Sequence, residues 1–185
     1  DRYNRYMILG LDVSTSITGA SVLDANGGMV FCEAWDMRNK NHFPDLYNKA
    51  SFIKGRLLDL SIHFHIKHIY IEQSLQAFRP GLSSAKTLLT LAKFNGIVSY
   101  ICQSDMGIKP EYVGASSARK LCGIKVQRGQ KAKEVVLKEI LDNTPDFSIQ
   151  YTKHGNPKPG SYDRADSLVI AKAGYKLWKE KSSKS

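Results

Sequence analysis

Short apolar runs rich in β-branched residues dominate the first third of the chain. Three of them predict β-strands, over residues 7–13, 17–23 and 29–35. The last two flank residues 24–28, which read Asp-Ala-Asn-Gly-Gly and form a strong hairpin-turn signal. The pattern therefore predicts an antiparallel meander of three strands.

Helical and strand patterns alternate along the rest of the chain. Apolar residues in steps of three and four predict a helix over residues 46–64, and a fourth strand over residues 66–71 ends at Glu72. The remaining predicted elements are a helix from Ser84 to the stop signal at residues 106–107, a strand over residues 110–113, short helices over residues 115–121 and from about 133 to about 141, and a last helix from Asp163 to about Lys179.

These elements place the chain in the α/β class. They predict a mixed five-stranded sheet, in which parallel strands join the antiparallel meander, flanked by helices. The sequence shows no internal repeat and no linker that would divide it. We therefore expect one domain over residues 6–180, followed by a flexible basic tail at residues 181–185.

The charge balance narrows the kind of partner. The chain has 27 Lys and Arg against 17 Asp and Glu, a net charge of +10, which favours a polyanionic partner, either nucleic acid or an anionic membrane face. No apolar run approaches the roughly 20 residues of a membrane helix, and no apolar signal core is present at the N-terminus, so we expect a soluble, non-secreted chain with no membrane partner. Cys32, Cys102 and Cys122 are odd in number and widely spaced, which fits a reducing compartment.

Four acidic residues stand at marked places in this pattern. Asp12 lies within the first predicted strand, Glu72 ends the fourth, and Asp163 and Asp166 open the last helix, where a spacing of three puts them on one face. Open α/β sheets bind ligands at the carboxyl ends of their strands. Mg²⁺ takes oxygen ligands, and two such ions about 3.5–4 Å apart can act on both the attacking water and the leaving oxygen of a phosphodiester.

Each acid also has a purely structural interpretation. Asp163 could be a helix N-cap, and Asp166 a first-turn acid favoured by the helix dipole. Glu72 could mark the point where a strand leaves the core. Asp12 is the hardest to explain in this way, because a carboxylate within an apolar strand needs a partner. The joint pattern in a basic chain favours the acidic centre of a metal-dependent nuclease.

Longer segments around these acids carry a family resemblance. In chain order they are GLDVSTSITGASV, IYIEQS, AKTLLTLAKFNGIVSYI, VGASSARKLCGI and YDRADSLVIAKAGY. In this order and at these distances they resemble the RuvC family of Holliday junction resolvases, of the RNase H-like superfamily, over about residues 7–175.

The resemblance implies both a fold and an activity. The fold is RNase H-like, and the activity is that of a dimeric endonuclease that cuts two opposed strands of a four-way DNA junction with Mg²⁺ or Mn²⁺ and leaves ligatable nicks. By motif position, Asp12, Glu72, Asp163 and Asp166 would be the catalytic, metal-binding acids, holding two ions per active site.

The sequence also departs from the bacterial members of this family. They carry a stacking aromatic residue two positions after the Glu-Gln pair, where this chain has Leu75; Phe78, three residues on, could take its place. The basic loop before Lys131 is longer than in the bacterial proteins. These differences suggest a phage, viral or organellar branch with looser substrate choice. Localisation would be cytoplasmic or nucleoid-associated in a bacterial or phage setting, and mitochondrial, plastid or viral-factory in the others.

DNA contacts are expected from basic and aromatic residues in the loops. The phosphate contacts should depend on salt and only weakly on DNA sequence. Phe78 is either a wedge that stacks on an unpaired base at the crossover or a hydrophobic staple for its own loop. The predicted DNA-binding residues are Phe78, Arg79, Lys86, Lys125, Arg128, Lys131 and Lys133, with Lys153 and Lys158 as outlying phosphate contacts.

A homodimer is expected from the symmetry of the reaction, since two equivalent cuts are most simply made by two equivalent subunits. The candidate interface by family position is the helix that begins at Ser84, with its small residues Ala85, Ala92 and Gly96. These residues could equally pack against the sheet.

Three other functions are compatible with parts of this pattern. The same acids could serve a nuclease for flaps, replication forks or R-loops. A non-catalytic junction-binding protein could share the fold, although loss of an acid would have been its signature. A sugar or acetate kinase-like ATP site also places an acid in a first strand, but the chain is too short for the two domains of such kinases.

Overall fold

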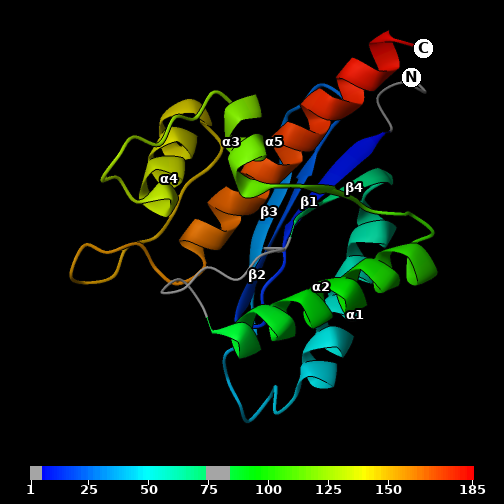
Figure 1. Ribbon diagram of the computed structural model, residues 1–185, viewed down its shortest axis with the longest axis vertical. Helices are drawn as coiled ribbons and strands as arrows, with labels where there is room; N and C mark the ends of the chain where they lie inside the picture. The colour runs from blue at the N-terminus through cyan, green and yellow to red at the C-terminus, as the bar shows by residue number, and fades with distance from the viewer. Residues whose placement is uncertain (1–5, 74–83) are drawn as a thin grey trace.

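A mixed five-stranded sheet organises the protein, which was analysed as a computed structural model that describes residues 6–73 and 84–185 (Figure 1). The strand order is β3-β2-β1-β4-β5. The pairs β1–β2 and β2–β3 are antiparallel, whereas β1–β4 and β4–β5 are parallel, which confirms the predicted fold class. The strands are β1 (Met7–Asp12), β2 (Ile17–Leu23), β3 (Met29–Asp36), β4 (Ile66–Glu72) and β5 (Glu111–Val113).

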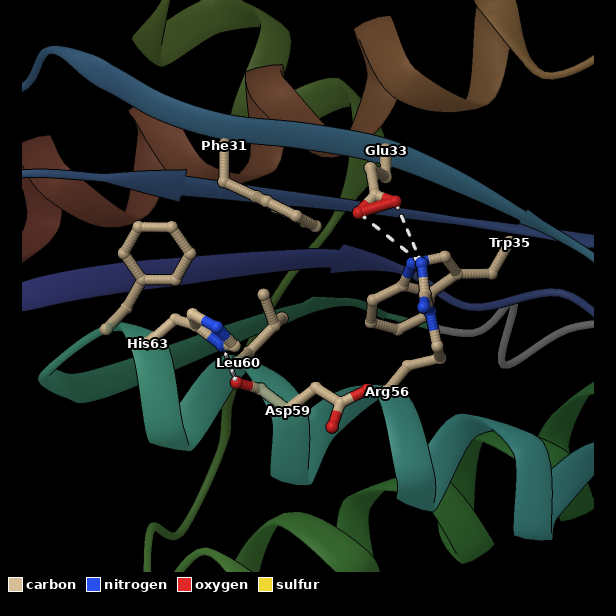
Figure 2. Close-up of a pocket in the computed structure, with 8 residues that line it drawn as sticks. Phe31, Glu33, Trp35, Arg56, Asp59, Leu60 and His63 are labelled. Carbon is tan, nitrogen blue, oxygen red and sulfur yellow. Dashed lines mark hydrogen bonds and ion pairs between the residues drawn. The ribbon is translucent and has the colours of Figure 1, made fainter.

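Helices cover both faces of this sheet. One face carries α1 (Leu46–His63) and α2 (Ala85–Asp105), and α1 runs beside β3, so that labelled side chains of the two elements point toward one another (Figure 2). The other face carries α3 (Ala115–Leu121), α4 (Ala132–Asn143) and α5 (Ser161–Ser183). None of the helices in the described ranges is both long and apolar enough to cross a membrane.

The helix ends follow local chemistry. The side chain of Asp45 caps α1 by accepting the main-chain N–H of Asn48 at 2.8 Å, and Ser84 caps α2 by accepting that of Thr87 at 3.1 Å. The last helix is longer than predicted: it begins two residues before Asp163 and continues to Ser183. The first three residues of the expected tail are therefore helical. The hydroxyls of Ser182 and Ser183 donate to the main-chain oxygens of Trp178 and Glu180, in the preceding turn.

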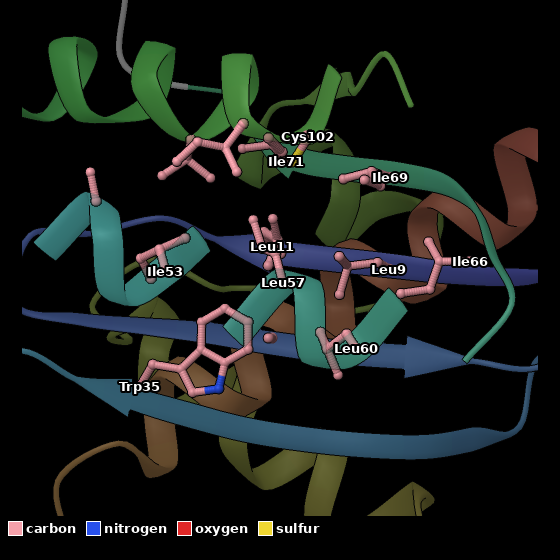
Figure 3. Packing of buried hydrophobic residues seen from close by; sticks show 14 of the residues in the cluster. Leu9, Leu11, Trp35, Ile53, Leu57, Leu60, Ile66, Ile69, Ile71 and Cys102 are labelled. Atoms are coloured by element: carbon pink, nitrogen blue, oxygen red, sulfur yellow. The ribbon is translucent and has the colours of Figure 1, made fainter. Parts of the chain in front are cut away.

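Strand alternation divides the interior into two cores. In β1, Leu9 and Leu11 enter the core under α1 and α2, shown in Figure 3, whereas Ile8 enters the core under α5. In β4, Ile69 and Ile71 follow Leu9 and Leu11 into the first core. Beyond the irregularity that pairs Met7 with Ile66, the even-numbered residues of both strands, such as Ile8 and Tyr70, face α5. The same alternation places Asp12 and Glu72, which end the strands, on this face.

The small residues of α2 lie on its outer, solvent-exposed face. Its buried residues include Phe94, Val98 and Cys102, which turn toward the sheet. The small residues that the sequence allowed on either side are exposed, as are two large apolar residues beside them, Leu89 and Tyr100, each 71% exposed. The apolar outer stripe consists of Ala85, Leu89, Ala92, Gly96 and Tyr100.

A close approach between α5 and β1 holds the second face together. Gly10 of β1 lies directly against Ala171 of α5, and a Cβ at Gly10 would overlap the main-chain nitrogen of Ala171. One strand away, the buried hydroxyls of Ser21 and Ser167 hydrogen-bond at 2.7 Å. Only small residues allow the helix to lie this near to the sheet.

We expect Gly10→Ala to destabilise the fold, because the added methyl group would force apart two main chains rather than displace a flexible side chain. The free energy of unfolding, measured by urea denaturation, should fall by about 1–3 kcal/mol. Gly55→Ala in α1 is the matched control, since nothing lies within 4 Å of the added carbon there. It should stabilise the protein by about 0.5–1 kcal/mol. A Gly10→Ala protein as stable as wild type would show that the helix is not so closely held.

Candidate active site

Two of the four acids end neighbouring parallel strands. Asp12 is the last residue of β1 and Glu72 the last of β4. They directly follow the paired residues Leu11 and Ile71, so they stand beside each other at the carboxyl edge of the sheet. Both point to the face that α5 covers. This is the position at which open α/β sheets bind ligands.

The other two acids are brought over this edge by the start of α5. Asp12 pairs with Gly19 of β2, and the main-chain carbonyl of Asp163 lies directly on Gly19, where no Cβ could be accommodated. The first turn of α5 therefore sits over the end of β1. Asp166, three residues further along, shares a helix face with Asp163.

The electrostatics show that the four acids share one environment. Burial raises the pKa of Asp12 well above its usual value, and the neighbouring Glu72 raises it further, followed by Asp166 and Asp163. Burial, then Glu72 and Asp163, raise the pKa of Asp166 to about 7, against which Arg119 acts weakly. Burial also raises the pKa of Asp163. Carboxylates influence one another in this way only when they are close together.

Basic residues from three elements surround this cluster. Arg119 of α3 lowers the pKa of Asp166, whereas Arg38, just after β3, and Lys133 of α4 lower that of Asp163. Arg38 also forms a two-pronged ion pair with Asp36, at 2.9 Å from Nε and 2.7 Å from Nη2. The cluster is therefore an acidic centre with a basic border.

Sequence reasoning identified Lys133 but missed Arg38 and Arg119. A signal for Arg119 was available, because it lies within the VGASSARKLCGI segment that carries the family resemblance. For Arg38 the signal was the hairpin register, which brings the end of β3 to the same edge of the sheet as the end of β1. Neither residue stands out from composition or periodicity.

The remaining predicted DNA contacts belong to several different elements and loops. Lys86 is exposed in the first turn of α2, and Lys125 lines an open cavity of about 440 Å³ together with Arg119. Arg128 and Lys131 are exposed before α4, and Lys153 and Lys158 are exposed before α5. Phe78 and Arg79 lie outside the described residues. The DNA-binding role of all these residues stays a prediction.

The donor set can be compared with what a metal ion requires. In the described part of the chain, no group of three or more His, Cys, Asp and Glu side chains is arranged so that it could already hold a metal ion. The chemistry of the donors nevertheless fits a hard divalent cation, because they are four carboxylates. Their mutual repulsion gives such a cation a role in stabilising the cluster. The site thus has suitable ligands that would have to close around an ion.

Comparison with solved structures identifies the fold. Thermus thermophilus RuvC in complex with Holliday junction substrate matches with a TM-score of 0.63 and 15% identity, covering 95% of this chain and 96% of that one. A second Thermus thermophilus RuvC structure matches with a TM-score of 0.59 and 15% identity over 94% and 96% of the chains. The yeast mitochondrial Holliday junction resolvase Ydc2 matches with a TM-score of 0.64 and 13% identity over 98% and 82%. The chain has the RNase H-like fold of RuvC.

This result confirms the fold that the sequence resemblance implied. The sequence matches no family model and no curated protein. At 13–15% identity, the likeness to RuvC and Ydc2 establishes the fold and not the activity. The case for an activity in this RuvC-like fold therefore depends on the acidic cluster itself.

We expect Asp166→Asn to stabilise the RuvC-like fold at pH 8 in the absence of divalent ions. The pKa of Asp166 rises from 3.8 to about 7 on folding, so folding favours its protonated form. The free energy of unfolding therefore includes the full contribution of protonated Asp166 below about pH 4. This contribution is lost as the pH rises from about 4 through about 7.

Thermal unfolding at pH 5 and pH 8 in EDTA tests whether Asp166→Asn is stabilising and whether the gain grows with pH. The melting temperature of Asp166→Asn should exceed that of wild type by roughly 2–4 °C for each kcal/mol of repulsion relieved, with the larger gain at pH 8. Asp146→Asn changes an exposed acid that does not contribute to the pKa shifts of Asp12, Asp163 or Asp166, so it should change the melting temperature little at either pH. A gain at pH 5 that equals the gain at pH 8 would contradict the raised pKa.

Proposed function

We propose that the protein is a divalent-metal-dependent endonuclease that resolves four-way DNA junctions. The observation that carries this proposal is the cluster of Asp12, Glu72, Asp163 and Asp166 at the carboxyl edge of a RuvC-like sheet. Mutually repelling carboxylates in a chain of net charge +10 suit a site where cations stand between the protein and a phosphodiester.

The four carboxylates are the proposed metal ligands, with two Mg²⁺ or Mn²⁺ ions per site. When bound, these ions would supply an activated water and positive charge opposite the reacting phosphate. The contribution of the chain is rigid placement of the ligands. Asp12 and Glu72 are fixed by the ladder between β1 and β4, and Asp163 and Asp166 by the first turns of α5.

The basic border has a separate role in binding DNA. Arg38, Arg119 and Lys133 lie near enough to the acids to affect their pKa values, so they are placed to hold the phosphates on either side of the one that is cut. The more distant basic residues, such as Lys125 and Arg128, would track the arms of the substrate. Their contribution should weaken as salt is added.

A homodimer is part of the proposal, because paired cuts on opposed strands call for two sites related by a two-fold axis. The outer stripe of α2 is the candidate interface. Its exposed Leu89 and Tyr100, together with small residues that permit close helix contact, form an apolar surface that a second copy would cover.

Other substrates remain alternatives. Flaps, forks and R-loops could be cut by the same acids, and the resolvase is favoured because the neighbouring folds are a RuvC bound to Holliday junction substrate and the Ydc2 resolvase. A non-catalytic junction-binding protein is disfavoured because all four acids are present and clustered. The protein would work wherever its DNA is, in a nucleoid or in an organelle, as the mitochondrial Ydc2 does.

We expect Asp12→Asn to abolish cutting and to keep junction binding, because the carboxylate is needed to bind the metal ions and not to contact DNA. Labelled four-way junctions, flaps and duplexes are incubated with and without Mg²⁺, and the cuts are mapped on denaturing gels. Wild type should nick the junction at two symmetric positions, only with Mg²⁺, and Asp12→Asn should be at least about 100-fold slower.

Binding by gel shift and an Asp146→Asn control separate lost chemistry from lost folding. Asp146→Asn should cut like wild type. Cutting by Asp12→Asn at the wild-type rate would refute the assigned site. Equal cutting of flaps and junctions by wild type would favour the alternative substrates.

We expect Leu89→Glu to produce a monomer, because two buried charges would face each other across the two-fold axis. Sedimentation velocity of the purified protein measures this directly. Tyr151→Glu changes an exposed aromatic residue in the loop between α4 and α5 and should leave the dimer intact. A Leu89→Glu protein that sediments like the wild-type dimer would exclude α2 as the interface.

A further inference from the structure

The peptide group that joins Glu72 to Gln73 is held on both of its sides. Its N–H, which belongs to Gln73, donates to the main-chain oxygen of Val113 in β5 at 2.9 Å. Its carbonyl oxygen, which belongs to Glu72, accepts a hydrogen bond from the side-chain amide of Asn95 in α2, 3.2 Å from Nδ2. The C=O and N–H of a planar trans peptide group point in opposite directions. The two hydrogen bonds therefore fix the orientation of this group.

The orientation of this peptide group bears directly on one of the four acids. Glu72 is the last residue of β4, and the pairing of β4 with β1 ends one residue earlier, at Ile71. The bonds to Val113 and Asn95 therefore hold the main chain at the point where the ladder with β1 has stopped. The main chain in turn sets the direction in which the Glu72 carboxylate leaves the strand.

Asn95 is an unfavourable residue for its position unless its amide is used. It lies in the middle of α2, where Asn is a poorer helix former than Ala or Leu. It is only 8% exposed, and its neighbours Phe94 and Val98 are completely buried. Burying an amide is costly unless the amide forms hydrogen bonds. The hydrogen bond to Glu72 explains why a polar residue stands on the buried face of this helix.

Two hydroxyl groups support the amide from its other side. Ser99, one turn further along α2, donates its hydroxyl to the main-chain oxygen of Asn95 at 2.7 Å, and this hydroxyl also lies 3.4 Å from Oδ1. The hydroxyl of Tyr112 in β5 donates to Ser99 Oγ at 2.7 Å. The amide oxygen therefore faces a hydroxyl while the amide nitrogen faces Glu72. Because Tyr112 precedes Val113, β5 supports the end of β4 both directly and through α2.

We propose that Asn95 is a positioning residue for Glu72. Its amide holds the peptide group after Glu72 and so keeps the carboxylate beside Asp12, in the orientation that a divalent ion requires. This inference rests on the proposed function, because it takes Glu72 to be a metal ligand. Groups that orient a metal ligand typically contribute about 10–100-fold to metal affinity. The effect of Asn95 should be near the lower end, because the bond to Val113 remains when the amide is removed.

Mn²⁺ binding to the purified full-length protein, without DNA, tests this proposal. Free Mn²⁺ is measured by electron paramagnetic resonance, and thermal unfolding in EDTA gives the folded fraction by which each protein concentration is corrected. Asn95→Leu removes the amide and nearly keeps the side-chain volume. Asn95→Ser leaves a hydroxyl that is too short to reach the Glu72 oxygen. Each variant should bind Mn²⁺ about 10-fold more weakly than wild type.

Thr144→Val is the matched control. Thr144 is also 8% exposed, and its hydroxyl accepts a hydrogen bond from Lys172 at 3.2 Å, but it lies at the end of α4 and does not contact Glu72. The variant loses a buried side-chain hydrogen bond, as the Asn95 variants do. It should bind Mn²⁺ with wild-type affinity.

A Glu72→Gln background distinguishes positioning of the carboxylate from a general loosening of the site. Glu72→Gln keeps three of the four acids but lacks the ligand that Asn95 orients, so Asn95→Leu should change its Mn²⁺ affinity little. Equal weakening by Asn95→Leu in both backgrounds would overturn the proposal, as would wild-type affinity in either folded Asn95 variant. Absence of Mn²⁺ binding by wild type would instead refute the proposed function, and the role of Asn95 with it.

Discussion

The contact of α5 with β1 and β2 is the constraint on which the rest of the structure depends. Gly10 and Gly19 lack side chains where the helix crosses, so the main chains of Ala171 and Asp163 can lie directly on the strands. Larger residues would lift the helix and carry Asp163 and Asp166 away from Asp12. The packing of the second core and the assembly of the acidic cluster therefore have one cause. This is how a fold can hold charged groups together: the free energy of apolar burial over the whole helix offsets local repulsion.

The repulsion between the acids lowers the stability of the fold, which points to a role for the cluster other than stability. Burial and neighbouring acids raise the pKa values of Asp12, Asp163 and Asp166, so that ionising all of them at neutral pH opposes folding. A region held together for stability alone would favour fewer acids. The basic residues do not neutralise the cluster directly, because Arg38, Arg119 and Lys133 stand at its border. Under the proposed function, divalent ions would supply positive charge inside the cluster, and the basic residues at its border would bind phosphates.

Much of this arrangement could be predicted from the sequence, and the limits have physical causes. Strand alternation and turn residues are local signals, so the meander, the strand that ends at Glu72 and the helix that follows Ser84 were predicted correctly. The i, i+3 spacing of Asp163 and Asp166 is also local. The sequence pattern left open whether Ala92 and Gly96 face the sheet, because small residues suit both environments. It missed Arg38 and Arg119 because their place beside the acids depends on strand register and on how α3 sits against α5, which are set by long-range packing.

The two faces of the sheet differ in chemistry, and the alternation of β3 shows why they can. Cys32 points toward α5, where its thiol meets the main-chain oxygen of Arg164 at 3.5 Å, whereas Phe31, Glu33 and Trp35 point toward α1. One strand thus supports the core under α5 with one set of residues and lines a cavity beside α1 with the other. Because each set can change without altering the other, a protein of this fold can keep its acidic cluster while the residues of the opposite face vary.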